Sequence, residues 1–383
     1  MPNIFRTPGV YIQEFDSTNK TIVAVSTSTA VLIGTFPKGR QYAITNIRSL
    51  QEFDRTYGGL RENNLSSLVA KQFFENGGKD LLVISTGIRF FQTATPLVQG
   101  LSLLSKIQSL NMLLIPETTL LSDREAAMIF QTAVPLIEKY RAMYFVDPPQ
   151  QDALRQTVQD LAVWFKAQSG IRHPNVMVYY PRVHVPSNSA SVSTVTIPNS
   201  GTMAGIFARF DSTRGVWKAP AGTEAKLQGV VGLEQVLTSQ DVTSLTLANI
   251  NALKQITSST YVAWGARTLS SNPEWKYVPV RRLALFVESS VEKGTAWAGF
   301  EPNDEPLWAQ IRQSVGTFMQ ALFRRGAFQG AKSQDAYFVK CGRETTTAAD
   351  QRAGFIHIMV GFAPLKPAEF IILNIQQTAR PIP

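Results

Sequence analysis

The chain has few of the residues that most often carry chemistry. Of its 383 residues, one is a cysteine, Cys341, and three are histidines, His173, His184 and His357. A single cysteine excludes an intrachain disulfide and a cysteine-based metal cluster. The histidines lack the spacing of metal ligands, and His357 lies in an apolar stretch that favours a core residue with a hydrogen-bond partner. Cys341 has no histidine near it in sequence, which favours a small buried residue over a nucleophile.

The sequence motifs of common enzyme classes are also absent. There is no phosphate loop, no dinucleotide fingerprint after a strand and no GxSxG elbow. The stretch 75–80 (ENGGKD) resembles a phosphate loop only superficially, because Asp80 stands where a hydroxyl is needed. Glu301, Asp304 and Glu305 are better interpreted as charges at a helix N-terminus than as an acid–base pair. We therefore expect no enzyme, no cofactor and no metal.

Long apolar runs and a concentrated charge are missing as well. No stretch approaches the roughly 18 apolar residues of a membrane span, and residues 1–6 lack the features of a secretory signal, so we expect synthesis in the cytoplasm. The net charge is +9, from 37 Lys and Arg against 28 Asp and Glu, but the densest basic groups are pairs, at 281–282 and 324–325. Nucleic-acid binders usually gather such charge on one face. A basic surface, free or matched to an acidic protein partner, is the better interpretation.

The composition that remains is that of a globular protein, with 44% hydrophobic and 17% charged residues. The length suggests two domains. We predict an arm with a short strand at residues 1–20, an α/β domain at 21–185, a small, polar boundary loop at 186–201 and a second domain at 202–383. The predicted fold class is α/β, with an α+β C-terminal domain.

In the first domain, strands alternate with helices, which suggests a partly parallel sheet. Ser122 and Glu125 form a predicted capping box at the start of one helix. The predicted strands are 22–25, 30–34, 81–84, 112–115, 143–147 and 176–180; the predicted helices are 65–76, 122–141 and about 154–165.

In the second domain, the strongest pattern is a helix at 306–325, with one apolar stripe, Asp304 as its cap and Gly326 at its end. The other predicted elements are helices at 202–214 and 245–256 and strands at 261–263, 283–287, 336–340, 355–360 and 369–375. The last strand is apolar on both sides, so it needs a sheet to join. Its composition leaves open whether that sheet belongs to the same chain or to another molecule.

Ten short stretches, taken in order, resemble the contractile tail sheath proteins of bacteriophages, R-type pyocins and related extracellular injection systems. Each is weak alone, and their order makes the resemblance specific over nearly the whole chain. They are PGVYIQE (8–14), VSTSTA (25–30), GTFPKG (34–39), FFENGG (73–78), AGIFAR (204–209), RGVWKAPA (214–221), WGARTL (264–269), FEPND with LW (300–304, 307–308), AYFV (336–339) and PLKPAEF (364–370).

The resemblance implies a compact two-domain sheath fold whose terminal strands are exchanged between subunits. It implies homo-oligomeric six-membered rings stacked around an inner tube protein, with baseplate and tail terminator proteins as further partners, and contraction that drives the tube through a cell envelope. Such a subunit is part of a virion tail or a released particle. The residues implied in strand exchange are Val10, Tyr11, Ile12, Phe15, Phe370, Ile371, Ile372, Leu373 and Ile375. The implied receiving sheet contains the strands at 283–287, 336–340 and 355–360.

By the same resemblance, the helix 306–325 and the loop after it face the tube. The candidate tube contacts are Arg312, Arg324, Arg325 and Lys332, for which a solvated surface is the simpler alternative. Three other functions remain open: a different tail or baseplate component of the same machine, an enzyme without a recognisable motif, and a nucleic-acid-binding module. The last two are disfavoured by the missing motifs and the scattered charge.

Overall fold

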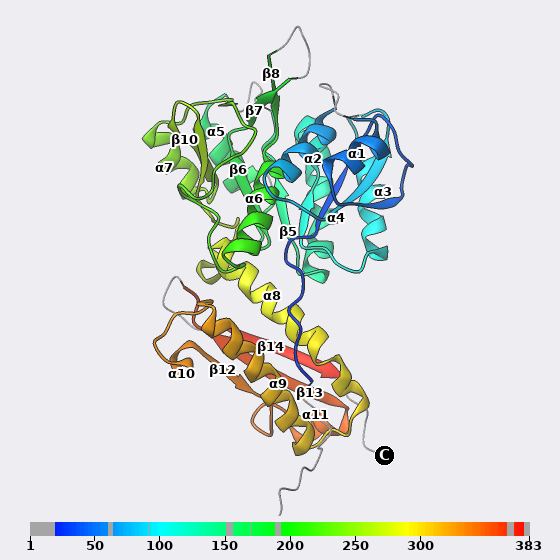
Figure 1. Cartoon of the computed structure of the whole chain (residues 1–383), viewed down its shortest axis with the longest axis vertical. Helices are drawn as coiled ribbons and strands as arrows, with labels where there is room; N and C mark the ends of the chain where they lie inside the picture. Colours follow the sequence, from blue (N-terminus) through cyan, green and yellow to red (C-terminus); the bar gives the residue numbers. More distant parts are fainter. Residues whose placement is uncertain are drawn as a thin grey trace, which may run out of the picture.

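The computed structural model describes residues 20–59, 64–90, 92–150, 156–168, 170–187, 193–365 and 371–378. It has two lobes joined by the helix α8 (Val278–Gly294), as Figure 1 shows. We call the described residues of 30–277 the large lobe and those of 296–378 the small lobe. No described helix is long and apolar enough to cross a membrane.

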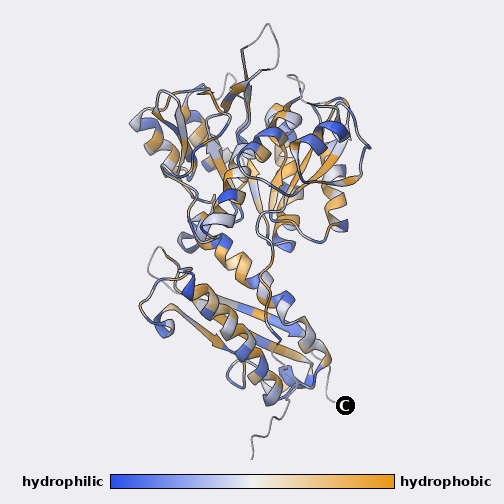
Figure 2. Ribbon diagram, in the orientation of Figure 1, coloured by the Kyte–Doolittle hydropathy of each residue, from blue (hydrophilic) through white to orange (hydrophobic). Residues whose placement is uncertain are grey.

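The large lobe is built on an eight-stranded sheet with the order β11-β10-β6-β5-β4-β1-β3-β2. The six strands from β10 to β3 run parallel to one another, and β2 and β11 pair antiparallel at the edges. Figure 2 shows hydrophobic residues gathered in its central strands, as expected for strands buried on both faces. The strands are β1 (Ala30–Thr35), β2 (Ile44–Ile47), β3 (Leu81–Gly87), β4 (Met112–Leu114), β5 (Met143–Val146), β6 (Val176–Tyr180), β10 (Asn251–Thr257) and β11 (Thr260–Trp264).

Helices cover both faces of this sheet. One core joins the sheet to α1 (Leu50–Tyr57), α2 (Leu65–Glu75) and α6 (Ser200–Thr213). The core on the opposite face joins it to α3 (Thr95–Ser102), α4 (Asp123–Lys139), α5 (Val158–Val163) and α7 (Ser239–Leu247). Helices α2 and α6 lie so close that a Cβ at Gly205 would be 2.5 Å from the Phe73 carbonyl oxygen. The predicted capping box of α4 is half formed, because Ser122 accepts from the Glu125 amide while the Glu125 carboxylate accepts from the Ala94 amide.

The predicted boundary at 186–201 does not coincide with a break between the lobes. There, β7 (Val183–Pro186) and β8 (Thr194–Ile197) form a hairpin, and β9 (Gly232–Leu233) joins it to make a small sheet. The chain then returns to the large lobe through α6, β10 and β11, and leaves it only at α8. Small, polar residues are equally suited to a hairpin loop and to a linker, so composition did not distinguish the two.

Three predicted elements are wrong. Residues 22–25 are not in a strand. The helix predicted at 245–256 ends at Leu247, and after a turn with Asn249 at a φ of 63° the chain enters β10. The strand predicted at 283–287 is the middle of α8. This helix buries residues against both lobes, so few polar residues interrupt its apolar ones and the 3.6-residue period of a helix is hard to see in the sequence.

The small lobe is an antiparallel sheet of β12 (Tyr337–Lys340), β13 (Phe355–Phe362) and β14 (Ile371–Thr378), in that order. Helix α8 contacts β14, and α9 (Glu305–Arg324) contacts β12. The predicted signals of α9 are confirmed, since the Asp304 carboxylate accepts from the Leu307 amide at 3.1 Å and Gly326 has a φ of 76°. Two short helices, α10 (Ser333–Ala336) and α11 (Ala348–Arg352), complete the lobe.

Candidate assembly surface and the joint behind it

The small-lobe sheet is covered on one face. Along β13, Ile356, Ile358 and Val360 are buried in the core with α8 and α9, while the alternate residues His357 and Met359 are only half-buried. Within the described residues β14 is an edge strand, and β12 is the other edge. An edge strand presents backbone N–H and C=O groups that can pair with another strand. The lobe therefore has the form of a sheet to which further strands can be added.

The residues predicted to exchange strands divide into two groups. Val10, Tyr11, Ile12, Phe15 and Phe370 lie outside the described residues. The others lie in β14, which pairs with β13 of the same chain along its whole length, from Ile371 opposite Phe362 to Thr378 opposite Phe355. In β14, Ile375 is buried in the lobe's core. Pairing within one chain is thus observed, and exchange between chains stays a prediction.

The four predicted tube contacts differ in how they are engaged. The Arg312 guanidinium donates to Glu305 at 2.7 Å and to the Cys341 carbonyl, so it already serves the small lobe. The Arg325 guanidinium lies 5.1 Å from the centre of the Trp217 ring. Arg324 and Lys332 are exposed, and their side chains make no hydrogen bond or ion pair with other described residues. Arg324 and Lys332 are consequently the two most available for a partner.

The structure accounts for the single cysteine and the three histidines without a catalytic or metal-binding role. Burial raises the pKa of the Cys341 thiol to about 12, and the residue is buried as predicted. His357 is not a core residue, because its ring lies half-exposed with Nε2 3.7 Å from the Asp350 carboxylate. His173 and His184 bond Glu138 and Thr196, both at 2.9 Å. The described residues contain no group of three His, Cys, Asp or Glu side chains that could hold a metal.

Two buried carboxyl groups lie where the central strands of the large lobe end. Glu117, after β4, accepts hydrogen bonds from the Thr35 amide at 2.8 Å and from the Ser66 hydroxyl at 2.6 Å. Asp147, after β5, accepts from the Ser200 amide at 2.9 Å, and burial raises its pKa to about 7. Open α/β sheets often bind ligands at such strand ends. Here these carboxyl groups join strand ends to the N-terminal ends of helices α2 and α6.

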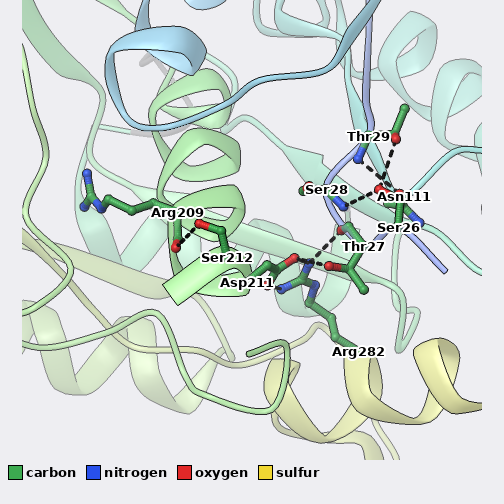
Figure 3. Close-up of polar contacts among 9 residues, drawn as sticks. All are labelled: Ser26, Thr27, Ser28, Thr29, Asn111, Arg209, Asp211, Ser212 and Arg282. Atoms are coloured by element: carbon green, nitrogen blue, oxygen red, sulfur yellow. Dashed lines mark hydrogen bonds and ion pairs between the residues drawn. The ribbon is translucent and has the colours of Figure 1, made fainter. Parts of the chain in front are cut away.

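A buried ion pair joins the large lobe to α8 (Figure 3). The Arg282 guanidinium donates to both carboxylate oxygens of Asp211 on α6, at 2.8 and 2.6 Å, and the two side chains are 5% and 6% exposed. The Thr27 hydroxyl donates to Asp211 at 2.7 Å, and Arg282 donates to the Thr27 carbonyl at 3.0 Å. Three segments far apart in sequence are therefore held at one point. We call the contact of Arg282, Asp211 and Thr27 the joint. The sequence did not predict it, because residues 281–282 stood out only as a basic pair.

Residues 20–29, which we call the strap, run beside α8 from the small lobe to the large one (Figure 1). At one end Lys20 bonds Glu301 at 3.1 Å and lies over the Trp297 ring. Midway, the Val25 amide donates to the Ser290 hydroxyl at 3.2 Å. At the other end the Thr29 hydroxyl donates to Asp80 at 2.8 Å. The strap is thus a second segment of chain, beside α8, that connects the two lobes.

Comparisons with known proteins identify this architecture. Residues 270–378, which include α8 and the small lobe, match the phage tail sheath C-terminal domain family. The chain is similar along 97% of its length to 99% of a chain in the helical sheath of the anti-feeding prophage in its contracted state, at 26% identity and a TM-score of 0.77. Residues 270–378 thus match the C-terminal domain of phage tail sheath proteins, and nearly the whole chain is similar to chains of contracted sheaths.

Two further similarities extend this finding. A chain of the contracted sheath complex of an extracellular contractile injection system, PVC, is 27% identical, with a TM-score of 0.74 over 97% of this chain and 98% of that one. A prophage major tail sheath protein of Pseudomonas aeruginosa (strain UCBPP-PA14) is 26% identical over 238 residues, which are 61% of this chain. The aligned part spans 57% of that relative. The matched domain family and these relatives are all described as sheath proteins, which are structural components.

Proposed function

We propose that this chain is the subunit of a contractile sheath, which polymerises as stacked six-membered rings around an inner tube and contracts to drive the tube through a target cell envelope. One observation carries the proposal: the likeness to the contracted sheath of the anti-feeding prophage covers almost all of both chains. The partners are further copies of the chain, the inner tube, the baseplate and a tail terminator. The subunit has no catalytic activity and is made in the bacterial cytoplasm before it becomes part of a tail or released particle.

In this proposal the terminal segments of each subunit link it to its neighbours. The strand at 10–15 of one copy adds to the small-lobe sheet of another, where β12 and β14 are the described edges. The last strand exchanges in the same way. The receiving sheet consists of β12 and β13, without residues 283–287, which are helical. Main-chain hydrogen bonds suit such a link because they resist pulling and require little of the side chains.

The tube contact is proposed at the C-terminal end of α9 and the loop after it. Arg324, Arg325 and Lys332 offer positive charge there, and an acidic tube surface would complement it. Exposed ion pairs contribute only ~0–1 kcal/mol each, so a set of them can hold the tube and still release it during contraction.

Electron microscopy of the purified protein tests the proposed function. We expect hollow tubes or stacked rings with six-fold symmetry as the protein concentration rises. A protein that stays monomeric at high concentration would contradict the proposal. Single rings that never stack would instead favour another tail or baseplate component.

A further inference from the structure

An apolar groove opens between the two lobes, at the N-terminal end of α8. Its volume is about 510 Å³. The large lobe contributes Trp217 and Ala219, α8 contributes Val280 and Leu283, and the small lobe contributes Leu365, which is 42% exposed. A concave, mostly apolar groove of this size is typical of a binding site rather than of a packing fault.

An exposed aromatic side chain lies at the opposite end of the same helix. Phe300 ends the short 3₁₀ helix Ala296–Phe300, which directly follows α8, and its side chain is 77% exposed. Among the described residues after 277, the exposed large hydrophobic side chains are Phe300 and Leu365. Within the described residues, the small lobe therefore leaves two apolar features uncovered: the Phe300 side chain, which we call the knob, and the groove wall at Leu365. Helix α8, which lies between them, is about 25 Å long at ~1.5 Å of rise for each of its 17 residues.

The charges around the knob and the groove are opposite in sign. Phe300 precedes Glu301 and Glu305, whose side chains are 44% and 56% exposed although Glu301 also pairs with Lys20 of the strap and Glu305 with Arg312 of the small lobe. Lys218 lines the groove, and the Arg325 guanidinium lies over the Trp217 ring that forms one of its walls. Complementary charges at the rim of an apolar contact fix its orientation and exclude wrong partners.

We propose that Phe300 of one copy inserts into the inter-lobe groove of a second copy. The inference rests on the proposed sheath function and names one of the contacts between its subunits. Because knob and groove lie at different places on the molecule, the contact is head-to-tail. Such contacts generate rings or open helices and cannot end at a dimer. The contact uses side chains of folded lobes, so it is independent of strand exchange at the chain ends.

The first test replaces the knob. Phe300→Ser is compared with Val236→Ser, which changes a side chain of similar exposure, 73%, in the large lobe. Because Phe300 is exposed in the single subunit, we expect both variants to keep the parent melting temperature. We expect Phe300→Ser alone to raise the protein concentration needed for polymerisation, by roughly tenfold or more. Sedimentation and electron microscopy measure this concentration.

The second test locates the partner surface with engineered thiols. Glu301→Cys and Lys218→Cys are made in separate proteins, mixed, and treated with a short bis-maleimide. The native Cys341 is buried and its thiol is held protonated, so it stays unreactive. We expect cross-linked dimers from the assembled mixture and none from a mixture of Glu301→Cys with Val236→Cys.

The outcomes separate this contact from the sheath function itself. Polymerisation of Phe300→Ser at the parent concentration, or no 301–218 cross-link in assembled protein, would overturn the contact and leave the sheath function standing. A variant that polymerises alone and fails only on the tube would show that the tube, and not a second copy, covers Phe300. A parent protein that never polymerises would overturn both proposals.

Discussion

The two sheets of the molecule differ in how much of them the chain itself covers. The eight-stranded sheet of the large lobe has helices on both faces, and the outer side of its edge strand β11 is bonded by residues 225–227, as in the 2.9 Å bond from the Leu227 amide to the Tyr261 carbonyl. The three-stranded sheet of the small lobe has helices on one face and a described edge at β14. The large-lobe sheet is therefore covered on both faces by its own chain, whereas the small-lobe sheet is covered on one face and has edges to which further strands can be added.

The ion pair that joins α8 to the large lobe is also shielded from solvent. The Arg282–Asp211 pair is almost fully buried, while pairs at the small-lobe surface such as Arg312–Glu305 are 35% and 56% exposed. A buried pair is costly to break, and an exposed pair is easily exchanged for water. This contrast suggests that the lobes keep one relative orientation while the small lobe's outer surface changes partners.

The largest effect should come from removing the arm. This deletion tests whether the small-lobe sheet takes up a strand from a neighbouring subunit. We expect deletion of residues 1–19 to leave a folded subunit with the parent stability, because the strap starts at Lys20 and keeps its contacts. The same deletion should abolish extended sheath, measured by electron microscopy, because no arm then adds to a neighbour's sheet. Deletion of residues 1–29 is the control, and it should also lower the melting temperature. Normal sheath from the shorter deletion would disprove strand exchange by the arm.

The second prediction concerns the closed joint. We expect Arg282→Met to lower the free energy of unfolding by about 3–5 kcal/mol, because Asp211 is then buried without its partner. Arg214→Met, which breaks an exposed pair with Glu224 at 3.5 Å, should cost less than about 1 kcal/mol. Chemical denaturation measures both.

A double variant distinguishes the contribution of the ion pair to the free energy of unfolding from its role in holding the strap. Asp211→Leu with Arg282→Met should recover much of the lost stability, because two apolar side chains replace two buried charges. It should still show faster amide hydrogen exchange at residues 25–29, since Thr27 has lost both partners. Unchanged exchange there would mean that the joint does not hold the strap.

The third prediction uses the pH dependence of the large lobe. Folding raises the pKa of Asp147 from 3.8 to about 7, so the folded protein binds a proton that the unfolded chain has lost between these pH values. The free energy of unfolding should therefore fall as the pH rises from about 4 to 7, by about 1.4 kcal/mol for each pKa unit. We expect Asp147→Asn to be more stable than the parent at pH 8 and equal to it near pH 4. Parallel pH curves for the two proteins would contradict this assignment.

Elements with local signals could be predicted from the sequence, and the joint could not. Helix α9 has an apolar stripe, a cap and a terminal glycine, and each signal is confirmed. The middle of α8 is an apolar run in the sequence. A helix buried between two lobes lacks the regular spacing of apolar and polar residues by which a helix is recognised. Arg282 meets Asp211 and Thr27 across 71 and 255 positions, so no spacing pattern relates them. For the assembly surface, the composition of the last strand did not say whether it pairs within the chain or with another molecule. The indication of a neighbouring subunit came from the ten ordered motifs that resemble sheath proteins.

The smallest effect should come from reversing charge at the proposed tube contact. We expect Arg324→Glu with Arg325→Glu to weaken assembly on the tube by about 1 kcal/mol per exposed pair, and to change self-polymerisation less. The Arg324 side chain makes no hydrogen bond or ion pair with other described residues, so its reversal should not affect folding, whereas Arg325 also covers Trp217. Binding to the purified tube at two salt concentrations measures the effect, which should shrink as salt screens the charges. Equal losses on the tube and in self-polymerisation would assign these residues to contacts between subunits, on the side of the molecule where the inter-lobe groove also opens.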